Sequence, residues 1–137
     1  MAGQLADSAA VRAIEATTGR VAVTPLSTFL ALLTAAPNPT DVMEDLVEVA
    51  PPGTAGYARQ QAVWSPAVGS PPTTHNVDQI VFGPFSEDLL PVTHCVLVTT
   101  QVVSSGLILF SWELDVSRDP MVGDSITFPS NSLTIHR

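Results

Sequence analysis

The segment Leu107-Ile108-Leu109-Phe110-Ser111-Trp112-Glu113-Leu114-Asp115-Val116 decides the fold of this chain. From residue 110 onward its side chains alternate, with Phe110, Trp112, Leu114 and Val116 on one face and polar groups on the other. Alternation with a period of two is typical of a β-strand that packs one face on a core and exposes the other. The pattern therefore predicts a half-buried strand over residues 107–116.

Short apolar runs on both sides of this strand are separated by Gly and Pro. They predict further strands over residues 57–64, 78–82, 92–100, 125–128 and 133–136, with turns at 83–84, 104–106 and 119–120. Residues 29–34 are a strand or a short helix by periodicity alone. Such spacing is typical of a mainly β protein, an antiparallel β-sandwich or a small barrel.

The run Val92 to Val98 lacks alternation. Val92, His94, Val96 and Val98 share one face, and Cys95 and Leu97 lie on the other. A strand that is apolar on both faces is typical of the centre of a sheet. We therefore expect it to be covered on both sides, with Cys95 buried.

The N-terminal residues predict a short helix. Asp7 or Ser8 can cap its start, and Gly19 can end it in the left-handed conformation. An Ala-rich stripe buries little area, so this segment, residues 1–20, is expected to dock on another subunit while residues 21–137 form a single β-sandwich domain. The candidate docking residues are Leu5, Ala6, Ala10, Ala13 and Ile14.

The segment 35–56 reads as a long surface connection with one short edge strand around residues 46–49. Its acidic residues lack the order of a calcium loop, and we expect them to form a solvated face; they are Asp41, Glu44, Asp45 and Glu48.

Composition limits the classes of function. The 137 residues suit one domain, and the net charge of -8 with no lysine argues against nucleic acid as a partner. No apolar run is long enough for a membrane helix, and the N-terminus lacks a basic signal region, so we expect a soluble protein made in the cytoplasm. Only 13% of residues are charged and 45% are hydrophobic, which favours burial of some surface in an assembly.

No motif for catalysis, a metal or a cofactor is found. The three histidines, His75, His94 and His136, lie in separate predicted elements, and no G-x-S-x-G motif is present. His94 and Cys95 point to opposite faces of a strand and cannot share one metal ion. We therefore expect no enzyme activity and no cofactor.

Several short motifs occur in a fixed order: Gly56-Tyr57-Ala58-Arg59-Gln60, Val81-Phe82-Gly83, Val92-Thr93-His94, Leu107-Ile108-Leu109 and Gly123-Asp124-Ser125-Ile126-Thr127-Phe128-Pro129. Together they resemble small virion proteins of tailed phages that infect actinobacteria, which are labelled tail fibre, minor tail or head decoration proteins. The resemblance favours a strand at residues 29–34. Its signature residues are Tyr57, Arg59, Gln60, Phe82, Gly83, Thr93, His94, Gly123 and Asp124.

The resemblance implies a virion structural protein, assembled in the host cytoplasm and bound to the major capsid protein or other virion subunits, with homo-oligomers expected. Because the chain is compact and has no fibrous repeat, we expect a head decoration or minor capsid protein on the outside of the shell. One alternative is a minor tail or tail-tip (fibre) protein that contacts the host surface. A second is a carbohydrate-binding module that uses Trp64 and Tyr57.

Two signature positions carry local predictions. Arg59 lies in a strand-like run of a chain with few basic residues, so it is expected to be buried and paired with a carboxylate or with backbone carbonyls. Gly123-Asp124 is expected to form a tight turn in which the Asp carboxylate accepts hydrogen bonds from nearby backbone amides.

Overall fold

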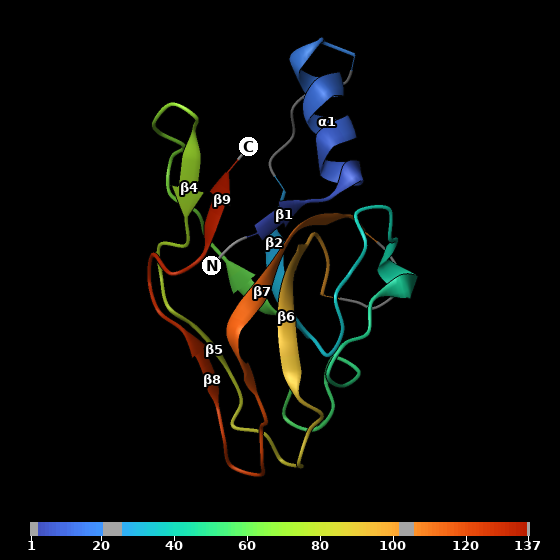
Figure 1. Cartoon of the computed structure of the whole chain (residues 1–137), viewed down its shortest axis with the longest axis vertical. Helices are drawn as coiled ribbons and strands as arrows, with labels where there is room; N and C mark the ends of the chain where they lie inside the picture. The colour runs from blue at the N-terminus through green and yellow to red at the C-terminus, as the bar shows by residue number, and fades with distance from the viewer. Residues whose placement is uncertain (1–2, 21–25, 102–105, 137) are drawn as a thin grey trace.

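A computed structural model describes residues 3–20, 26–101 and 106–136 of the chain (Figure 1). The described strands are all paired antiparallel, and one short α-helix stands at the N-terminal end. The protein is therefore mainly β, as predicted. Most of the predicted turn at 104–106, and the start of the predicted sandwich domain at 21–25, lie outside the described residues.

The main layer is a five-stranded sheet in the order β1-β7-β6-β2-β3. Its strands are β1 (Gly3–Leu5), β2 (Thr28–Leu33), β3 (Gln60–Ala62), β6 (Val92–Val98) and β7 (Ile108–Arg118). Leu32, Cys95 and Trp112 form one cross-strand row, and burial raises the pKa of the Cys95 thiol above its ordinary value. Residues 29–34 are thus mostly strand, which confirms the choice that the resemblance favours.

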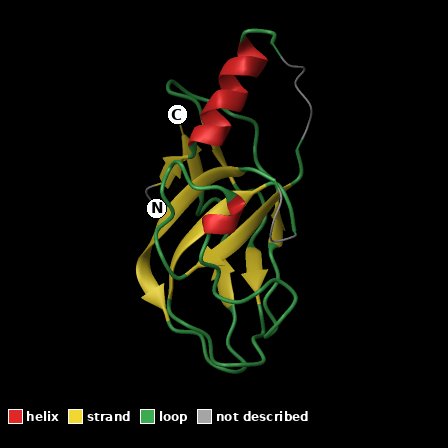
Figure 2. Cartoon of the chain, turned by 90° about the vertical axis from the view of Figure 1, so that its right-hand side faces the viewer, coloured by secondary structure: helices red, strands yellow, loops and turns green. Residues whose placement is uncertain are grey.

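The second layer is made of two small sheets. One pairs β5 (Ile80–Phe82) with β8 (Ile126–Phe128), and the other pairs β4 (Thr73–His75) with β9 (Thr134–His136). Within the described residues, β1 and β3 at the edges of the main sheet are each paired on one side only, so the strands form an open sandwich instead of a closed barrel (Figure 2).

The larger core fills the space between the two layers. Its aromatic side chains are buried, and Phe110 and Trp112 lie there as the alternation predicts. Its members are Leu30, Leu32, Val49, Tyr57, Ala62, Ile80, Phe82, Phe85, Val92, Cys95, Leu97, Phe110, Trp112, Ile126, Phe128 and Leu133.

A smaller core covers the opposite face of the main sheet. There Val96 and Val98 of β6 pack with Met43 from η1, a 3-10 helix (Met43–Asp45) in the connection after β2. The other buried members are Ala6, Ala31, Leu33 and Ile108. The C-terminal half of β6 is therefore covered on both faces, as predicted for a central strand.

Two predictions about which side chains of the strands face the core are wrong. Val92 belongs to the larger core with Cys95, because a register shift between Val92 and His94 moves it to the other face. Val116 is 71% exposed, because β7 and β8 leave between them an open hollow of about 270 Å³ that Val116 lines.

The helix α1 (Asp7–Thr17) agrees with the predicted span, but its cap does not. The N-cap residue is Ala6, which makes no side-chain cap hydrogen bond; Asp7 lies in the first turn, and the Ser8 hydroxyl donates to the Ile108 carbonyl. Gly19 has a φ of 75°, so it follows the helix in the left-handed conformation that the sequence predicts. Figures 1 and 2 show α1 extending away from the sheets at one end of the molecule.

Several short elements differ from the prediction. The connection of residues 35–56 contains η1 and two isolated bridges, Leu33 with Glu48 and Thr54 with Tyr57, instead of an edge strand. In the predicted strand 57–64 only β3 is regular, and the strands β1 and β4 fall where the sequence predicts none.

Candidate docking surfaces

The N-terminal stripe of apolar residues lies on the surface. No residue of α1 is buried, and Ile14 is 63% exposed. Leu5, Ala10, Ala13 and Ile14 line a hollow of about 470 Å³, which Thr17 and Thr18 extend. The structure therefore brings four of the five candidate docking residues together on one accessible face.

Ala6, the fifth candidate, has a different position. It is buried in the smaller core, and its N–H donates to the Leu109 carbonyl at 3.0 Å. Together with the pairing of β1 and β7, this contact fixes the base of α1 to the main sheet. Ala6 thus anchors the segment to the main sheet, while no residue of α1 beyond it is buried.

The signature residue Arg59 is buried and paired, as predicted. Its guanidinium forms an ion pair with Glu48, to which Nε donates at 3.2 Å, and Nη1 donates to the Thr100 carbonyl at 3.0 Å. The expectation that Glu48 belongs to a solvated acidic face is therefore wrong, because its carboxylate is enclosed beside Arg59. Asp41 and Asp45 instead accept hydrogen bonds from the backbone N–H groups of Asn38 and Val42.

Tyr57 completes this network. Its hydroxyl donates to Glu48 Oε2 at 2.7 Å and accepts from the backbone N–H of Leu32 at 3.0 Å. Burial, together with the charge of Glu48 and the hydrogen bond to it, raises the pKa of Tyr57 far above its ordinary value. The network thus joins the loop before β3 to β2 inside the sandwich.

Glycines of the quoted motifs, two of them signature residues, lie where three turns meet. An added Cβ at Gly56 would lie 2.5 Å from the Pro84 carbonyl oxygen, and one at Gly83 would lie 2.8 Å from that of Asp124. Gly123 has a φ of 86°, and Asp124 Oδ2 accepts from the Met121 N–H at 2.9 Å, which confirms the predicted tight turn. We call this meeting of the turns around Gly56, Gly83 and Gly123 the signature junction.

Phe82 and Gln60 also have structural positions. Phe82 is fully buried and stacks on Tyr57 with ring centroids 6.0 Å apart, and its edge meets Phe128. Gln60 opens β3 opposite Leu30 and donates to the Ala58 carbonyl. Phe82 is therefore a core residue, whereas Gln60 is partly exposed at the start of β3.

His94 lines a polar hollow on the outer face of the main sheet, whereas its neighbour Thr93 does not. The volume of the hollow is about 220 Å³, and the side chains of Ser111 and Glu113 reach it from the neighbouring strand. His94 Nδ1 is hydrogen bonded to the Thr93 hydroxyl at 2.8 Å, and within the described chain neither Ser111 nor Glu113 hydrogen bonds to the ring. Only the pairing of β6 with β7, which is invisible in the motifs, brings His94 beside Ser111 and Glu113.

The aromatic residues of the carbohydrate alternative are engaged inside the fold. Tyr57 is 1% exposed. Trp64 stacks on Trp112 with centroids 6.0 Å apart, and its indole N–H donates to the Thr28 hydroxyl at 3.1 Å. A sugar platform that uses Tyr57 is therefore wrong, and Trp64 has one ring face covered.

The described residues contain no cluster of three or more His, Cys, Asp or Glu side chains placed to bind a metal ion. In the same residues, no helix has the length and apolar character to cross a membrane.

The chain matches one protein family over nearly its whole length. Residues 4–136 match the family described as "Podophage GP4 fiber I protein gp80". Comparison with curated proteins finds no match. The matched region includes the stripe of α1, the buried network around Arg59 and the signature junction, and on this match the chain belongs to the podophage GP4 fiber I protein gp80 family of phage virion proteins.

Proposed function

We propose that this chain is a fibre or minor tail subunit of the phage particle and that it joins the particle through the apolar stripe of α1. The description of the family as a fibre protein supports the tail over a head decoration role, which was the first expectation from the sequence. In this proposal the role is structural, without catalysis, and the partner is another virion subunit.

One observation supports the proposal: α1 is helical although none of its apolar side chains is buried. A helix of 11 residues is marginal in water unless a face packs on something. Within the described residues, Ala6, the Asp7 N–H and the Ser8 hydroxyl attach the start of α1 to its own chain. No residue of α1 is buried. Packing of Leu5, Ala10, Ala13 and Ile14 on a neighbouring subunit supplies the burial that the domain itself does not.

The charge of the chain suits protein contacts more than contacts with DNA. A net charge of -8 with no lysine gives no basic patch for the phosphate backbone. Attachment is therefore expected to depend on packing and polar contacts, and empty and DNA-filled particles are expected to carry equal amounts of the protein.

The test compares two substitutions in α1. Ile14→Glu places a charge in the hollow, whereas Val11→Glu introduces the same charge at a residue that is 54% exposed and does not line the hollow. Phage particles that lack the protein are produced in the host, and each variant is supplied in its place. Quantitative mass spectrometry then measures the amount of the variant in each particle. Both variants are expected to fold with the parent's circular dichroism, but only Val11→Glu joins the particle at the parent's level. Normal incorporation of folded Ile14→Glu would refute attachment through the stripe.

A further inference from the structure

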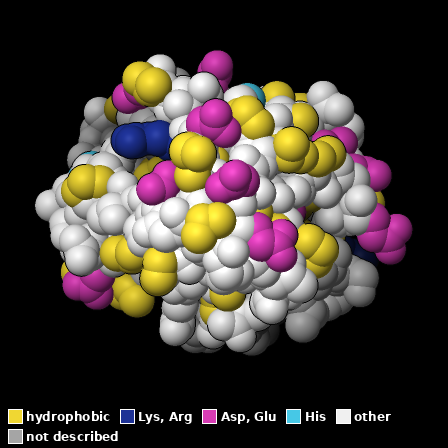
Figure 3. Space-filling model, turned by 90° about the horizontal axis from the view of Figure 1, so that it is seen from below, with side chains coloured by type: hydrophobic (Ala, Val, Ile, Leu, Met, Phe, Trp, Pro, Cys, Tyr) yellow, Lys and Arg dark blue, Asp and Glu magenta, His cyan; other side chains and the backbone are white. Residues whose placement is uncertain are grey.

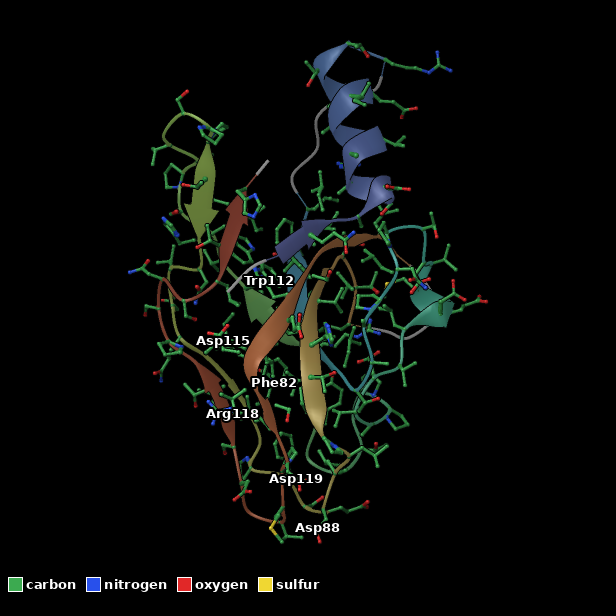
Figure 4. The ribbon with its side chains drawn as sticks, viewed as in Figure 1. Phe82, Asp88, Trp112, Asp115, Arg118 and Asp119 are labelled. Atoms are coloured by element: carbon green, nitrogen blue, oxygen red, sulfur yellow. The ribbon has the colours of Figure 1, made fainter. Side chains whose placement is uncertain are left out.

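The end of the molecule opposite α1 is built from two turns. One connects β5 to β6 and the other connects β7 to β8, and Figure 4 shows Asp88 and Asp119, one from each turn, at this end. We call residues 86–91 and 119–124 the distal tip. Neither the buried network nor the stripe of α1 includes it.

The two turns are held to each other by hydrogen bonds. The Leu89 N–H donates to the Pro120 carbonyl, and the Val122 N–H donates to Asp88 Oδ1, each at 2.9 Å. Phe85, just before the first turn, is buried in the larger core and fixes the tip to the sandwich. The conformation of the tip is thus set before any partner binds, which reduces the entropy lost on binding.

This ordered tip exposes large apolar side chains. Leu90 is 65% exposed, Met121 59% and Val122 63%. Turns are usually polar, and apolar residues grouped on a rigid turn are typical of a contact surface. Their burial by a partner would be favourable, and little ordering of the tip would oppose it.

Acidic groups surround these apolar side chains. Glu87, Asp88, Asp119 and Asp124 are exposed, and the two turns contain no lysine or arginine. Figure 3, which views the molecule from below, shows hydrophobic and acidic side chains interleaved across this face, with a basic side chain also visible, and the exposed Arg118 directly precedes the second turn. The tip therefore combines apolar contacts with a negative rim.

We propose that the distal tip docks on a second kind of virion subunit, on a surface with an apolar centre and a rim of Arg or Lys. Charge complementarity selects such a partner, because opposite rims attract and fix the orientation. Two copies of this chain meeting tip to tip would instead bring acidic rims together, which disfavours the contact. The inference rests on the proposed function only in taking the chain to be a particle subunit.

A glycan is a poor fit to the same surface. A sugar ring is commonly held on an aromatic platform, and the two turns contain no Trp or Tyr. The adjacent Phe85 is buried and cannot stack on a ligand. The chemistry of the tip therefore favours a protein.

The methionines of the chain offer a test with an internal control. Met121 lies on the tip, whereas Met43 is 5% exposed in the smaller core. Particles are assembled with the chain labelled by photo-methionine, irradiated, and digested for cross-link mass spectrometry. We expect Met121 to link to another virion protein with Lys or Arg within a few residues of the linked position, and Met43 to link only within its own chain.

The outcomes separate this inference from the proposed function. Incorporation of the labelled protein tests attachment alone, and Ile14→Glu tests the stripe. The tip proposal is wrong if labelled protein is present in particles but Met121 gives no link to another protein. It is also wrong if Met121 links to a second copy of this chain or to a segment without basic residues. In each of these cases the attachment through α1 stands. A matched pair of variants is tested with photo-leucine at position 90 as the cross-linking probe. Met121→Glu is expected to reduce cross-linking from this probe at least tenfold. Val68→Glu changes a residue that is exposed elsewhere and is expected to leave the cross-linking unchanged.

Discussion

Arg59 and Glu48 form a buried ion pair that joins three segments of the chain. The carboxylate comes from the connection after β2, the guanidinium from the residue before β3, and Nη1 of the same guanidinium binds the Thr100 carbonyl beyond β6. A buried charge is costly unless its partner and hydrogen bonds are complete. The pair therefore makes the correct placement of the long connection a condition for a stable fold.

Arg59→Lys is expected to lower the free energy of unfolding by about 2 to 4 kcal/mol, because Lys cannot reproduce the planar fork and leaves part of Glu48 unpaired. Urea denaturation followed by tryptophan fluorescence measures the change. Arg118→Lys, at an exposed position, is the control and should lie within about 0.5 kcal/mol of the parent. Equal stability of the two variants would show that the fork geometry does not matter.

Tyr57 is the single tyrosine of the chain, so tyrosinate absorbance reports on it alone. Its pKa in the folded state is raised above the ordinary 10.0, so its contribution to stability is complete below pH 10 and is lost as the pH rises further. Stability should fall by about 1.4 kcal/mol per pH unit in that range. We expect the absorbance change to coincide with unfolding seen by circular dichroism. Ionisation near pH 10 in the folded protein would contradict the burial.

Gly56→Ala and Gly53→Ala separate collision from backbone strain at the signature junction. Both glycines have positive φ, but an added Cβ at Gly56 meets the Pro84 carbonyl oxygen, whereas nothing lies within 4 Å of one at Gly53. Gly53→Ala should cost about 1 kcal/mol from the left-handed conformation alone. Gly56→Ala should cost about 2 kcal/mol more, measured by thermal or urea unfolding. An equal loss of unfolding free energy in the two variants would mean that the backbone around Pro84 moves away from the added Cβ without a measurable penalty.

Gly3→Ala tests how β1 is held. An added Cβ would lie 1.9 Å from the ring of Phe110, which is buried and cannot move aside. We expect release of β1 with the base of α1, seen as faster hydrogen exchange over residues 4–10, while the exchange of β6 is unchanged. Gln4→Ala, at the exposed neighbouring position, is the control and should exchange like the parent.

The strands that carry a strong local pattern were predictable from the sequence. Phe110 and Trp112 alternate with polar residues, and the run around Val96 is apolar on both faces, so burial dictates both elements. The register shift beside Val92 was not predictable, because it depends on how β6 and β7 meet. The strand β1 has no pattern of its own and forms because the edge of β7 pairs with it.

The candidate surfaces were predictable in part. The spacing of Ala10, Ala13 and Ile14 identified one face of the helix, and the structure keeps that face exposed. Burial of Ala6 depends on tertiary contacts with the smaller core, which spacing does not encode. The role of Glu48 was missed for a similar reason, since its partner Arg59 is brought to it by folding.

The most direct test of the account is the position and copy number of this protein in the purified particle. Antibody-gold labelling locates it, and quantitative mass spectrometry against the major capsid protein counts it. A fibre or minor tail subunit is expected to label the tail and to occur in far fewer copies than the capsid protein. Label distributed over the head, with copies in the hundreds, would contradict the proposed tail role and restore a decoration role on the shell.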